Sequence, residues 1–281
     1  MLFTKLLRHA RPKGTAVCVR SFRPFTSSSG ASSPGASSRF LLGAAYLPHP
    51  EKVATGGEGA HYTSECKRLV AVADGVGGWK DMGVDSGLFS RELMELVGNY
   101  VSETSDVDPY AVMEHAYKNV EAIGTSTICV LSVQKGKLTG CNLGDSGFAV
   151  FRRGGEPGDA SEEYKIVFRT DDQTHFFNCP FQIGTNSNDG PEKADQVELD
   201  VASGDVVVAA TDGIFDNLFD EDVERELNNA LGKDAGHGEE GTEALLQEAA
   251  NEICVLSQVY GLDPNRHGPF SHSAKSFGSG A

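Results

Sequence analysis

Three acidic residues each follow directly after a predicted apolar strand. They are Asp74, Asp145 and Asp212, and each is followed by Gly or Ser. One such step is a common turn, because Asp and Gly suit the backbone geometry of turns. Three of them after neighbouring buried strands would bring carboxylates together, and a cation would have to offset their mutual repulsion. Oxygen ligands of this type suit Mg²⁺ or Mn²⁺, so the pattern predicts a divalent-metal site.

Other kinds of site do not fit the same residues. A calcium-binding EF-hand loop needs oxygen ligands at alternate positions, whereas the third residue counted from Asp212 is Ile214. The segment 144–147 (Gly-Asp-Ser-Gly) lacks the spacing of a serine-hydrolase nucleophile elbow, and the sequence has no Gly-Lys-Ser/Thr phosphate loop. In the glycine-rich segment 75–78, the third glycine of a dinucleotide fingerprint would fall on Lys80. Calcium sensing, serine hydrolysis and nucleotide binding are therefore disfavoured.

The hydrophobic pattern predicts the elements that would position these acids. Apolar residues at three- and four-residue spacing predict helices over 86–101, 109–123, 221–231 and 242–260. Short apolar runs predict strands over 69–73, 126–133, 137–143, 147–152 and 164–169, with 196–201 and 205–211 as a further hairpin. Short links favour antiparallel pairing. Because strands and helices come in blocks, we expect an α+β layered fold, with one domain over residues 41–281.

Composition and charge disfavour two kinds of partner. The chain has 281 residues and a formal net charge of −16. Since seven of the 24 basic residues fall within residues 1–40, residues 51–281 carry 17 basic residues against 40 acidic ones. A body of this charge lacks the Lys/Arg clusters that hold a phosphate backbone, so no nucleic-acid partner is expected. The longest aliphatic run of the body, over 206–210, is far shorter than the roughly 18–20 residues of a membrane span, so none is expected.

Residues 1–40 have the composition of a targeting segment. They contain seven Lys or Arg residues, many Ser residues and no acidic residue, and residues 1–8 can form a short amphipathic helix. This composition predicts an organellar presequence over 1–40, mostly disordered, with the mitochondrial matrix as the destination. A chloroplast transit peptide has a similar composition, and a disordered basic tail has the same charge pattern, so both stay as alternatives. The six scattered cysteines, without zinc spacing, indicate thiols in a reducing compartment.

Five segments of the chain occur in the order typical of one enzyme family. They are Gly56-Gly57-Glu58, Val72-Ala73-Asp74-Gly75-Val76-Gly77-Gly78-Trp79, Gly124-Thr125-Ser126-Thr127, Asn142-Leu143-Gly144-Asp145-Ser146-Gly147-Phe148 and Thr211-Asp212-Gly213-Ile214-Phe215-Asp216-Asn217. On these motifs, residues 56–270 resemble the metal-dependent serine/threonine protein phosphatases of the PPM (type 2C) family. The second and fifth segments are most similar to its organellar branch, which includes the T-cell-activation phosphatase homologue.

The resemblance implies a fold, a reaction and a set of ligands. The fold would be a four-layer αββα sandwich of two antiparallel sheets flanked by helices. Asp74 would bridge two Mg²⁺ or Mn²⁺ ions, and Asp74 and Asp212 would be the catalytic residues. The other ligands would be Glu58 and the Gly75 carbonyl on one ion and Asp212 on the second, with Asp145, Asp212 and Asp216 around a weaker third ion. The metals would activate water to hydrolyse phosphoserine and phosphothreonine in phosphorylated organellar proteins, and we expect a monomer.

Three departures from the family's pattern bear on activity. Gly59 stands where the family has an Asp after Glu58, and such a loss of support around a metal costs about 10- to 100-fold in affinity or activity. Val76 stands where many members have a His. After Pro269-Phe270 the family's Gly-Gly-Lys-x-Asp-Asp-Ile-Thr segment is missing, so we expect one carboxylate ligand and the C-terminal strand to be absent. The alternative function is therefore a catalytically impaired pseudophosphatase that acts as a regulatory binding module.

Two further residues are expected to have structural roles. Trp79, the single tryptophan of the chain, is expected to pack beneath its loop instead of contacting a substrate. His175 is expected to position the loop before the next strand.

Overall fold

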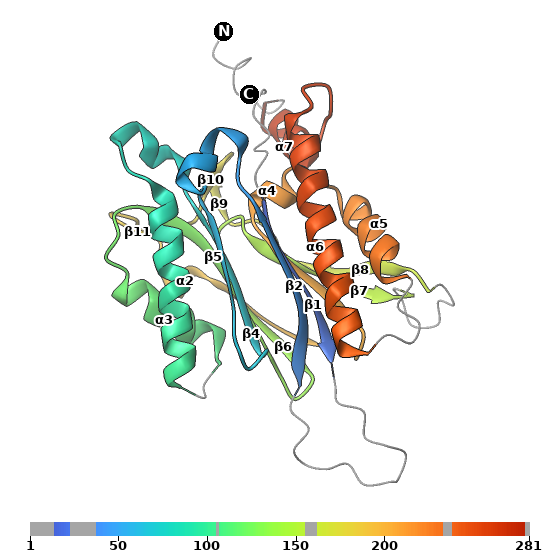
Figure 1. The fold of residues 1–281 in the computed structure, drawn as a ribbon. Helices are drawn as coiled ribbons and strands as arrows, with labels where there is room; N and C mark the ends of the chain where they lie inside the picture. Colours follow the sequence, from blue (N-terminus) through green and yellow to red (C-terminus); the bar gives the residue numbers. More distant parts are fainter. Residues whose placement is uncertain (1–13, 23–37, 105–106, 155–161, 233–237, 279–281) are drawn as a thin grey trace.

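Two antiparallel sheets lie face to face, and helices cover their outer faces (Figure 1). The computed structural model describes residues 14–22, 38–104, 107–154, 162–232 and 238–278. Each strand pair within these residues is antiparallel. The four-layer αββα sandwich expected from the resemblance is thereby confirmed.

One sheet has six strands, and its middle is completely buried. In the order β12-β6-β5-β4-β3, with β11 beside β5, its strands are β12 (Asp195–Asp200), β6 (Lys137–Leu143), β5 (Thr125–Gln134), β4 (Leu69–Gly75), β3 (Gly59–Thr63) and β11 (Ile183–Gly184). Every residue of β4 is buried, as expected for a strand covered on both faces. The β5–β6 link uses Lys135 and Gly136 at φ +51° and +81°, because a two-residue hairpin turn of this kind needs two positive φ angles.

The other sheet has five strands, and the third predicted acid follows the end of its central strand. In the order β2-β1-β13-β7-β8, its strands are β2 (Arg39–Leu47), β1 (Gly14–Phe22), β13 (Val206–Ala210), β7 (Gly147–Arg153) and β8 (Tyr164–Arg169). A separate two-stranded ribbon contains β9 (Thr174–Phe176) and β10 (Cys179–Pro180). All five residues of β13 are buried, and Asp212 comes two residues after this strand ends.

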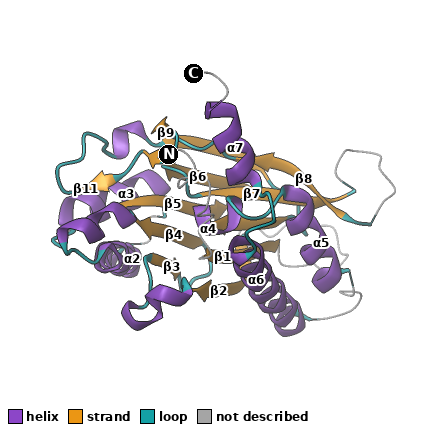
Figure 2. Cartoon of the chain, turned by 90° about the horizontal axis from the view of Figure 1, so that it is seen from above, coloured by secondary structure: helices purple, strands orange, loops and turns teal. Residues whose placement is uncertain are grey.

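Helices form the two outer layers, as seen from above in Figure 2. The six-stranded sheet is covered by α2 (Ser86–Glu103) and α3 (Pro109–Asn119), and the five-stranded sheet by α5 (Asp220–Leu231) and α6 (Glu239–Leu262). Shorter helices are α4 (Asp212–Phe215), α7 (Pro269–Gly278) and the 3₁₀ helices η1 (Pro50–Thr55), η2 (Gly77–Met82) and η3 (Pro191–Lys193). Asp85 and Asp108 cap α2 and α3 by accepting hydrogen bonds from backbone N–H groups of the first turn.

Apolar side chains form three layers that hold the sheets and helices together. Phe40, Val72 and Phe148 belong to the layer between the two sheets. Phe89 belongs to the layer between the six-stranded sheet and its helices, and Ile253 to the corresponding layer on the other side. Burial of apolar surface is the main favourable term in folding, so these layers also fix the strand ends that carry the acidic residues.

The predicted hairpin over 196–201 and 205–211 is wrong. Both segments are strands, but β12 pairs with β6 in one sheet whereas β13 lies between β1 and β7 in the other. The burial patterns explain the difference, because β12 is an edge strand with alternating exposure and β13 is buried throughout. The link between them therefore crosses from one sheet to the other.

Gly14–Phe22, which fall within the leader over residues 1–40 that was expected to be mostly disordered, form a strand. These residues form β1, which pairs with β2 on one side and with β13 on the other. An average composition over forty residues hides this nine-residue run, whose Val, Thr and Phe residues favour strands. Residues 1–13 and 23–37 of the predicted presequence lie outside the described residues.

The end of the described chain forms a helix. After α6, no strand occurs among the described residues up to position 278. The five-stranded sheet is nevertheless continuous, because β1 lies between β2 and β13. Within the described ranges, no helix is long and apolar enough to cross a membrane.

Candidate active site

The pairing of β3 with β4 brings Glu58 next to Asp74. Gly59 lies opposite Asp74, and the backbone N–H of Gly75 donates a hydrogen bond to the carbonyl oxygen of Glu58 at 3.0 Å. Both acidic residues are buried, with 5% of their surface exposed. A Cβ atom on Gly75 would lie 2.3 Å from the carbonyl oxygen of Ser86, so the close approach of α2 requires glycine here.

Lys52, which belongs to none of the sequence motifs, binds the carboxylate of Glu58. Its Nζ lies 2.6 Å from Oε2 of Glu58, and the hydroxyl of Ser86 donates to Oε1 at 3.5 Å. The lysine comes from η1, which Pro50 begins and which ends at Gly56 in a left-handed conformation with φ +81°. Because this ion pair depends on how η1 turns back over β3, no spacing rule in the sequence indicates it.

A chain of neighbours connects Asp74 to the Asp145 turn. Thr127 of β5 lies opposite Asp74, and its hydroxyl forms a 2.7 Å hydrogen bond with the hydroxyl of Ser146. Asp145 and Ser146 belong to the three-residue link between β6 and β7, which begins at Gly144. The hydroxyl of Ser126 also donates to the backbone carbonyl of Asp74 at 2.9 Å. The ends of β4, β5 and β6 are thus held together across the sheet.

The acids of the other sheet lie at the same end of the sandwich. Ala210 of β13 lies opposite Gly147, which follows Ser146, so Asp212 begins α4 close to the Asp145 turn. Asp212 is buried, and its carbonyl accepts a 2.7 Å hydrogen bond from the N–H of Asp216 one turn later. This register brings the predicted acids of both sheets to one end of the molecule.

Asp145 and Asp216 line one pocket of about 190 Å³ together with Asp172. Asp172 is not among the site residues predicted from the sequence motifs. Desolvation and the nearby charge of Asp212 raise the pKa of Asp172 above its ordinary value, whereas Arg169 acts in the opposite direction. Asp172 therefore feels the charge of Asp212 and also lines the pocket that contains Asp145 and Asp216. The Asp171-Asp172 pair after the predicted strand 164–169 is the one sequence signal for this residue. The signal is weak, because two adjacent acids are usual in exposed turns.

The donor atoms suit a divalent ion, but they are not preassembled as a cluster. Carboxylate oxygens are the ligands that Mg²⁺ and Mn²⁺ prefer, and burial of Glu58, Asp74 and Asp212 favours a compensating cation. In the described part of the chain, however, no three His, Cys, Asp or Glu side chains are grouped closely enough to hold a metal ion. The structure brings the acids to one end as two sets, one around Glu58 and Asp74 and one around Asp145, Asp172 and Asp216.

Comparisons with known proteins place the chain among the phosphatases. Residues 65–258 match the family model described as stage II sporulation protein E. The chain is 39% identical over 244 residues to the probable protein phosphatase 2C 80 of Arabidopsis thaliana, covering 85% of this chain and 54% of that protein. It is 38% identical over 223 residues to the protein phosphatase PTC7 homolog of Danio rerio, covering 73% of this chain and 69% of that protein. The chain belongs to the PPM (type 2C) protein phosphatase family.

Solved structures agree with membership of the PPM family. The photosystem II phosphatase PBCP is 29% identical, with a TM-score of 0.71 over 83% of this chain and 85% of that one. The catalytic domain of the serine/threonine phosphatase PstP, in complex with two manganese ions, has a TM-score of 0.51 over 89% of this chain and 95% of that one at 15% identity. The second likeness concerns the fold alone. The chain spans about half the length of the Arabidopsis relatives that it matches.

Two PPM departures noted in the sequence have defined places in the fold. Gly59 is the first residue of β3 and lies opposite Asp74. Val76 follows β4, and its N–H donates to the carbonyl of Thr125 at 2.9 Å, which joins the Asp74 loop to β5. Val76 therefore supports the backbone of this loop where many PPM members have a His.

Proposed function

We propose that this protein is a Mg²⁺- or Mn²⁺-dependent protein serine/threonine phosphatase that acts in an organelle. The proposal depends on one observation above all. In a chain of the PPM family, buried acids from the ends of both sheets face the same end of the sandwich, with Glu58 and Asp74 on one sheet and Asp212 on the other. PPM phosphatases are metal-dependent as a family, and the oxygen donors present here have the chemistry that such an ion requires.

The residues proposed to hold the metals are those of the family motifs. Glu58, Asp74, the Gly75 carbonyl and Asp212 would hold the metal ions, and Asp145 and Asp216 would join Asp212 in holding a weaker further ion. Bound metal would supply an activated water and positive charge for the phosphoryl oxygens. The two catalytic residues would be Asp74 and Asp212.

The chain's own contacts prepare this end of the molecule for a charged ligand. The hydroxyl of Ser126 binds the carbonyl of Asp74, and the N–H of Gly75 binds the carbonyl of Glu58, so the backbone that carries both acids is held rigidly. Pre-organisation of this kind reduces the cost of ordering side chains when a substrate binds.

The substrates would be phosphorylated proteins of the organelle that the leader specifies. The composition of residues 1–40 supports the mitochondrial matrix, and the likeness to a photosystem II phosphatase keeps a chloroplast destination as the alternative. We propose that the protein acts as a monomer.

Phosphate release from a phosphothreonine peptide with Mn²⁺ tests the proposal. The full chain should release phosphate, and both EDTA and Asp74→Ala should reduce the rate to background. Asp200→Ala is the matched control, because Asp200 is an exposed acid on the edge strand β12. A variant with native circular dichroism and no turnover would support the assignment of Asp74. Folded wild-type protein that binds the peptide without turnover would instead support a binding module.

A further inference from the structure

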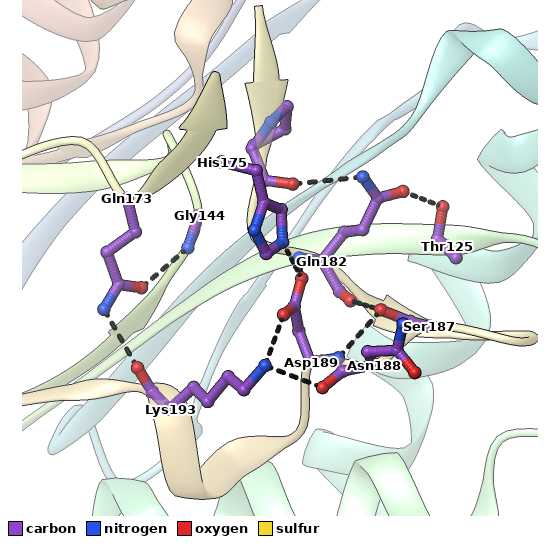
Figure 3. Close-up of polar contacts among 10 residues, drawn as sticks. Thr125, Gly144, Gln173, His175, Gln182, Ser187, Asn188, Asp189 and Lys193 are labelled. Atoms are coloured by element: carbon purple, nitrogen blue, oxygen red, sulfur yellow. Dashed lines mark hydrogen bonds and ion pairs between the residues drawn. The ribbon is translucent and has the colours of Figure 1, made fainter.

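A polar pocket of about 400 Å³ lies beside the candidate active site, and the proposed catalytic residues do not line it. Its walls are Trp79 and Thr125 on one side and His175, Gln182 and residues 185–189 on the other. The volume is within the range of natural ligand sites, about 300–1,000 Å³. Figure 3 shows the polar contacts that hold the His175–Asp189 side of the pocket in place.

The pocket is joined to the loop that follows Asp74 through Trp79 and Thr125. Thr125 lies at the start of β5, where its carbonyl accepts the hydrogen bond from Val76. Its hydroxyl accepts the indole N–H of Trp79 at 2.7 Å and donates to Oε1 of Gln182 at 2.6 Å. This relay connects η2, β5 and the 182–189 segment, so both walls are fixed relative to Asp74. A molecule with one group at the acidic site could place its neighbouring groups in the pocket.

The ionised groups of the pocket are already neutralised by one another. Asp189 is buried and accepts hydrogen bonds from Nε2 of His175 at 2.8 Å, from Nζ of Lys193 at 2.9 Å and from the N–H of Gln182 at 3.1 Å. Burial alone would raise the pKa of Asp189, but these donors outweigh it and hold the pKa below its ordinary value. The stacking of His175 on Phe181, with ring centres 4.3 Å apart, fits the structural role expected for this His. The pocket therefore presents little uncompensated charge to a ligand.

The groups left for a ligand are uncharged and polar. Asn186 and Asn188 are exposed at the pocket, and their side-chain amides form no hydrogen bond within the described part of the chain. Each side-chain amide can both donate and accept, as a peptide bond does. The indole face of Trp79 adds an apolar surface of the kind that packs against a polypeptide.

We propose that this pocket binds the uncharged main chain of the protein substrate next to its phosphorylated Ser or Thr. The inference rests on the proposed function and adds to it a substrate-binding role for Asn186, Asn188 and Trp79. The neutralised state of Asp189 decides against a second phosphate group, which would require free positive charge. The two asparagine amides bind the substrate's peptide groups, and Trp79 packs beside them.

Fluorescence of Trp79 offers a direct test, because this is the single tryptophan of the chain. The probe is the dephosphorylated threonine peptide, titrated into the full chain without metal. We expect a saturable change in tryptophan fluorescence. The variant Asn186→Gly/Asn188→Ala should bind about tenfold more weakly, because two hydrogen bonds are lost. Glycine is chosen at position 186 because Asn186 has φ +56°. Asn229→Ala, an exposed asparagine on α5, is the control and should leave the affinity unchanged.

Kinetics separate failure of this inference from failure of the proposed function. Hydrolysis of p-nitrophenyl phosphate, which has no polypeptide, should be equal in wild type and in the double variant. The KM for a phosphothreonine peptide should rise about tenfold in the double variant, with kcat unchanged. Absence of wild-type turnover on both substrates would overturn the proposed function. Wild-type turnover with an unchanged peptide KM in the double variant would overturn the pocket.

Discussion

The ammonium group of Lys52 lies 2.6 Å from Oε2 of Glu58, so a buried acid at the candidate active site is held by a lysine from η1. A Cβ atom on Gly77 would lie 3.1 Å from Oε1 of Glu58 and 3.6 Å from Nζ of Lys52. The ion pair thus lies directly against the backbone where η2 begins. A divalent ion on Glu58 would have to share this carboxylate with the ammonium group.

Lys52→Met is expected to increase the affinity for Mn²⁺ about 3- to 10-fold. The substitution removes a positive charge beside Glu58 while it keeps most of the apolar stem, and the partly exposed position limits the effect. Mn²⁺ titrations followed by thermal unfolding measure this change. Lys137→Met is the control. Lys137 begins β6, at the end of that strand away from Asp145, and pairs with Glu198 of the edge strand β12. Equal affinities in Lys52→Met and wild type would show that the lysine does not compete with metal.

Gly75→Ala is expected to lower the free energy of unfolding by about 1–3 kcal/mol, because the new methyl group meets the backbone of Ser86. The same substitution three residues later serves as a matched control. A Cβ atom on Gly78 has no neighbour within 4 Å, so Gly78→Ala should change stability by less than about 0.5 kcal/mol. Urea unfolding of both variants measures the difference. Equal stabilities would mean that α2 can shift away from β4.

Asp189→Asn is expected to destabilise the protein by about 1–3 kcal/mol at pH 7, since Asp189 loses charged hydrogen bonds to His175 and Lys193. The folded-state pKa of Asp189 lies below its ordinary value. Its contribution is therefore complete above about pH 4, the unfolded pKa, and is lost as the pH falls through the lower folded pKa. Urea unfolding at pH 7 and at pH 3 should show the gap between variant and wild type narrowing. A gap that is independent of pH would contradict this account.

Truncation of residues 1–22 is expected to lower the melting temperature by on the order of 10 °C, because β2 and β13 lose their shared partner. Differential scanning calorimetry of the truncated and full-length chains measures the change. Truncation of residues 1–13 provides the comparison, since it leaves β1 intact. If both truncated chains had the same melting temperature as the full chain, β1 would add nothing to the stability of the sheet.

Much of the fold could be predicted from local patterns. The strands β6 and β8 have the predicted bounds because turn residues delimit short apolar runs on both sides. Asp74, Asp145 and Asp212 lie at strand ends as expected, since a polar step after a buried strand marks where the strand leaves the core. Which of the two sheets a strand enters depends on pairing between segments far apart in the sequence. The predicted pairing of β13 with β12 was wrong for this reason.

The contacts around the predicted site were harder to predict. Lys52 reaches Glu58 only because η1 and β3 are joined by a glycine turn, and Asp172 lies near Asp212 only because β8 and α4 meet at the same end. Such contacts join residues on separate elements, so neither periodicity nor motif spacing contains them. The pocket at Trp79 was missed for the same reason, because its opposite wall is about one hundred residues further along the chain.

The place of β1 has a consequence for how the protein could mature. A protease that cut near Arg39 would remove an internal member of a sheet, and the facing edges of β2 and β13 would both be left with unpaired backbone groups. Exposed strand edges recruit other strands, including those of neighbouring molecules. Processing of the leader would therefore be a folding event as well as a cleavage, and the cell would need to supply a replacement strand or a chaperone at that moment.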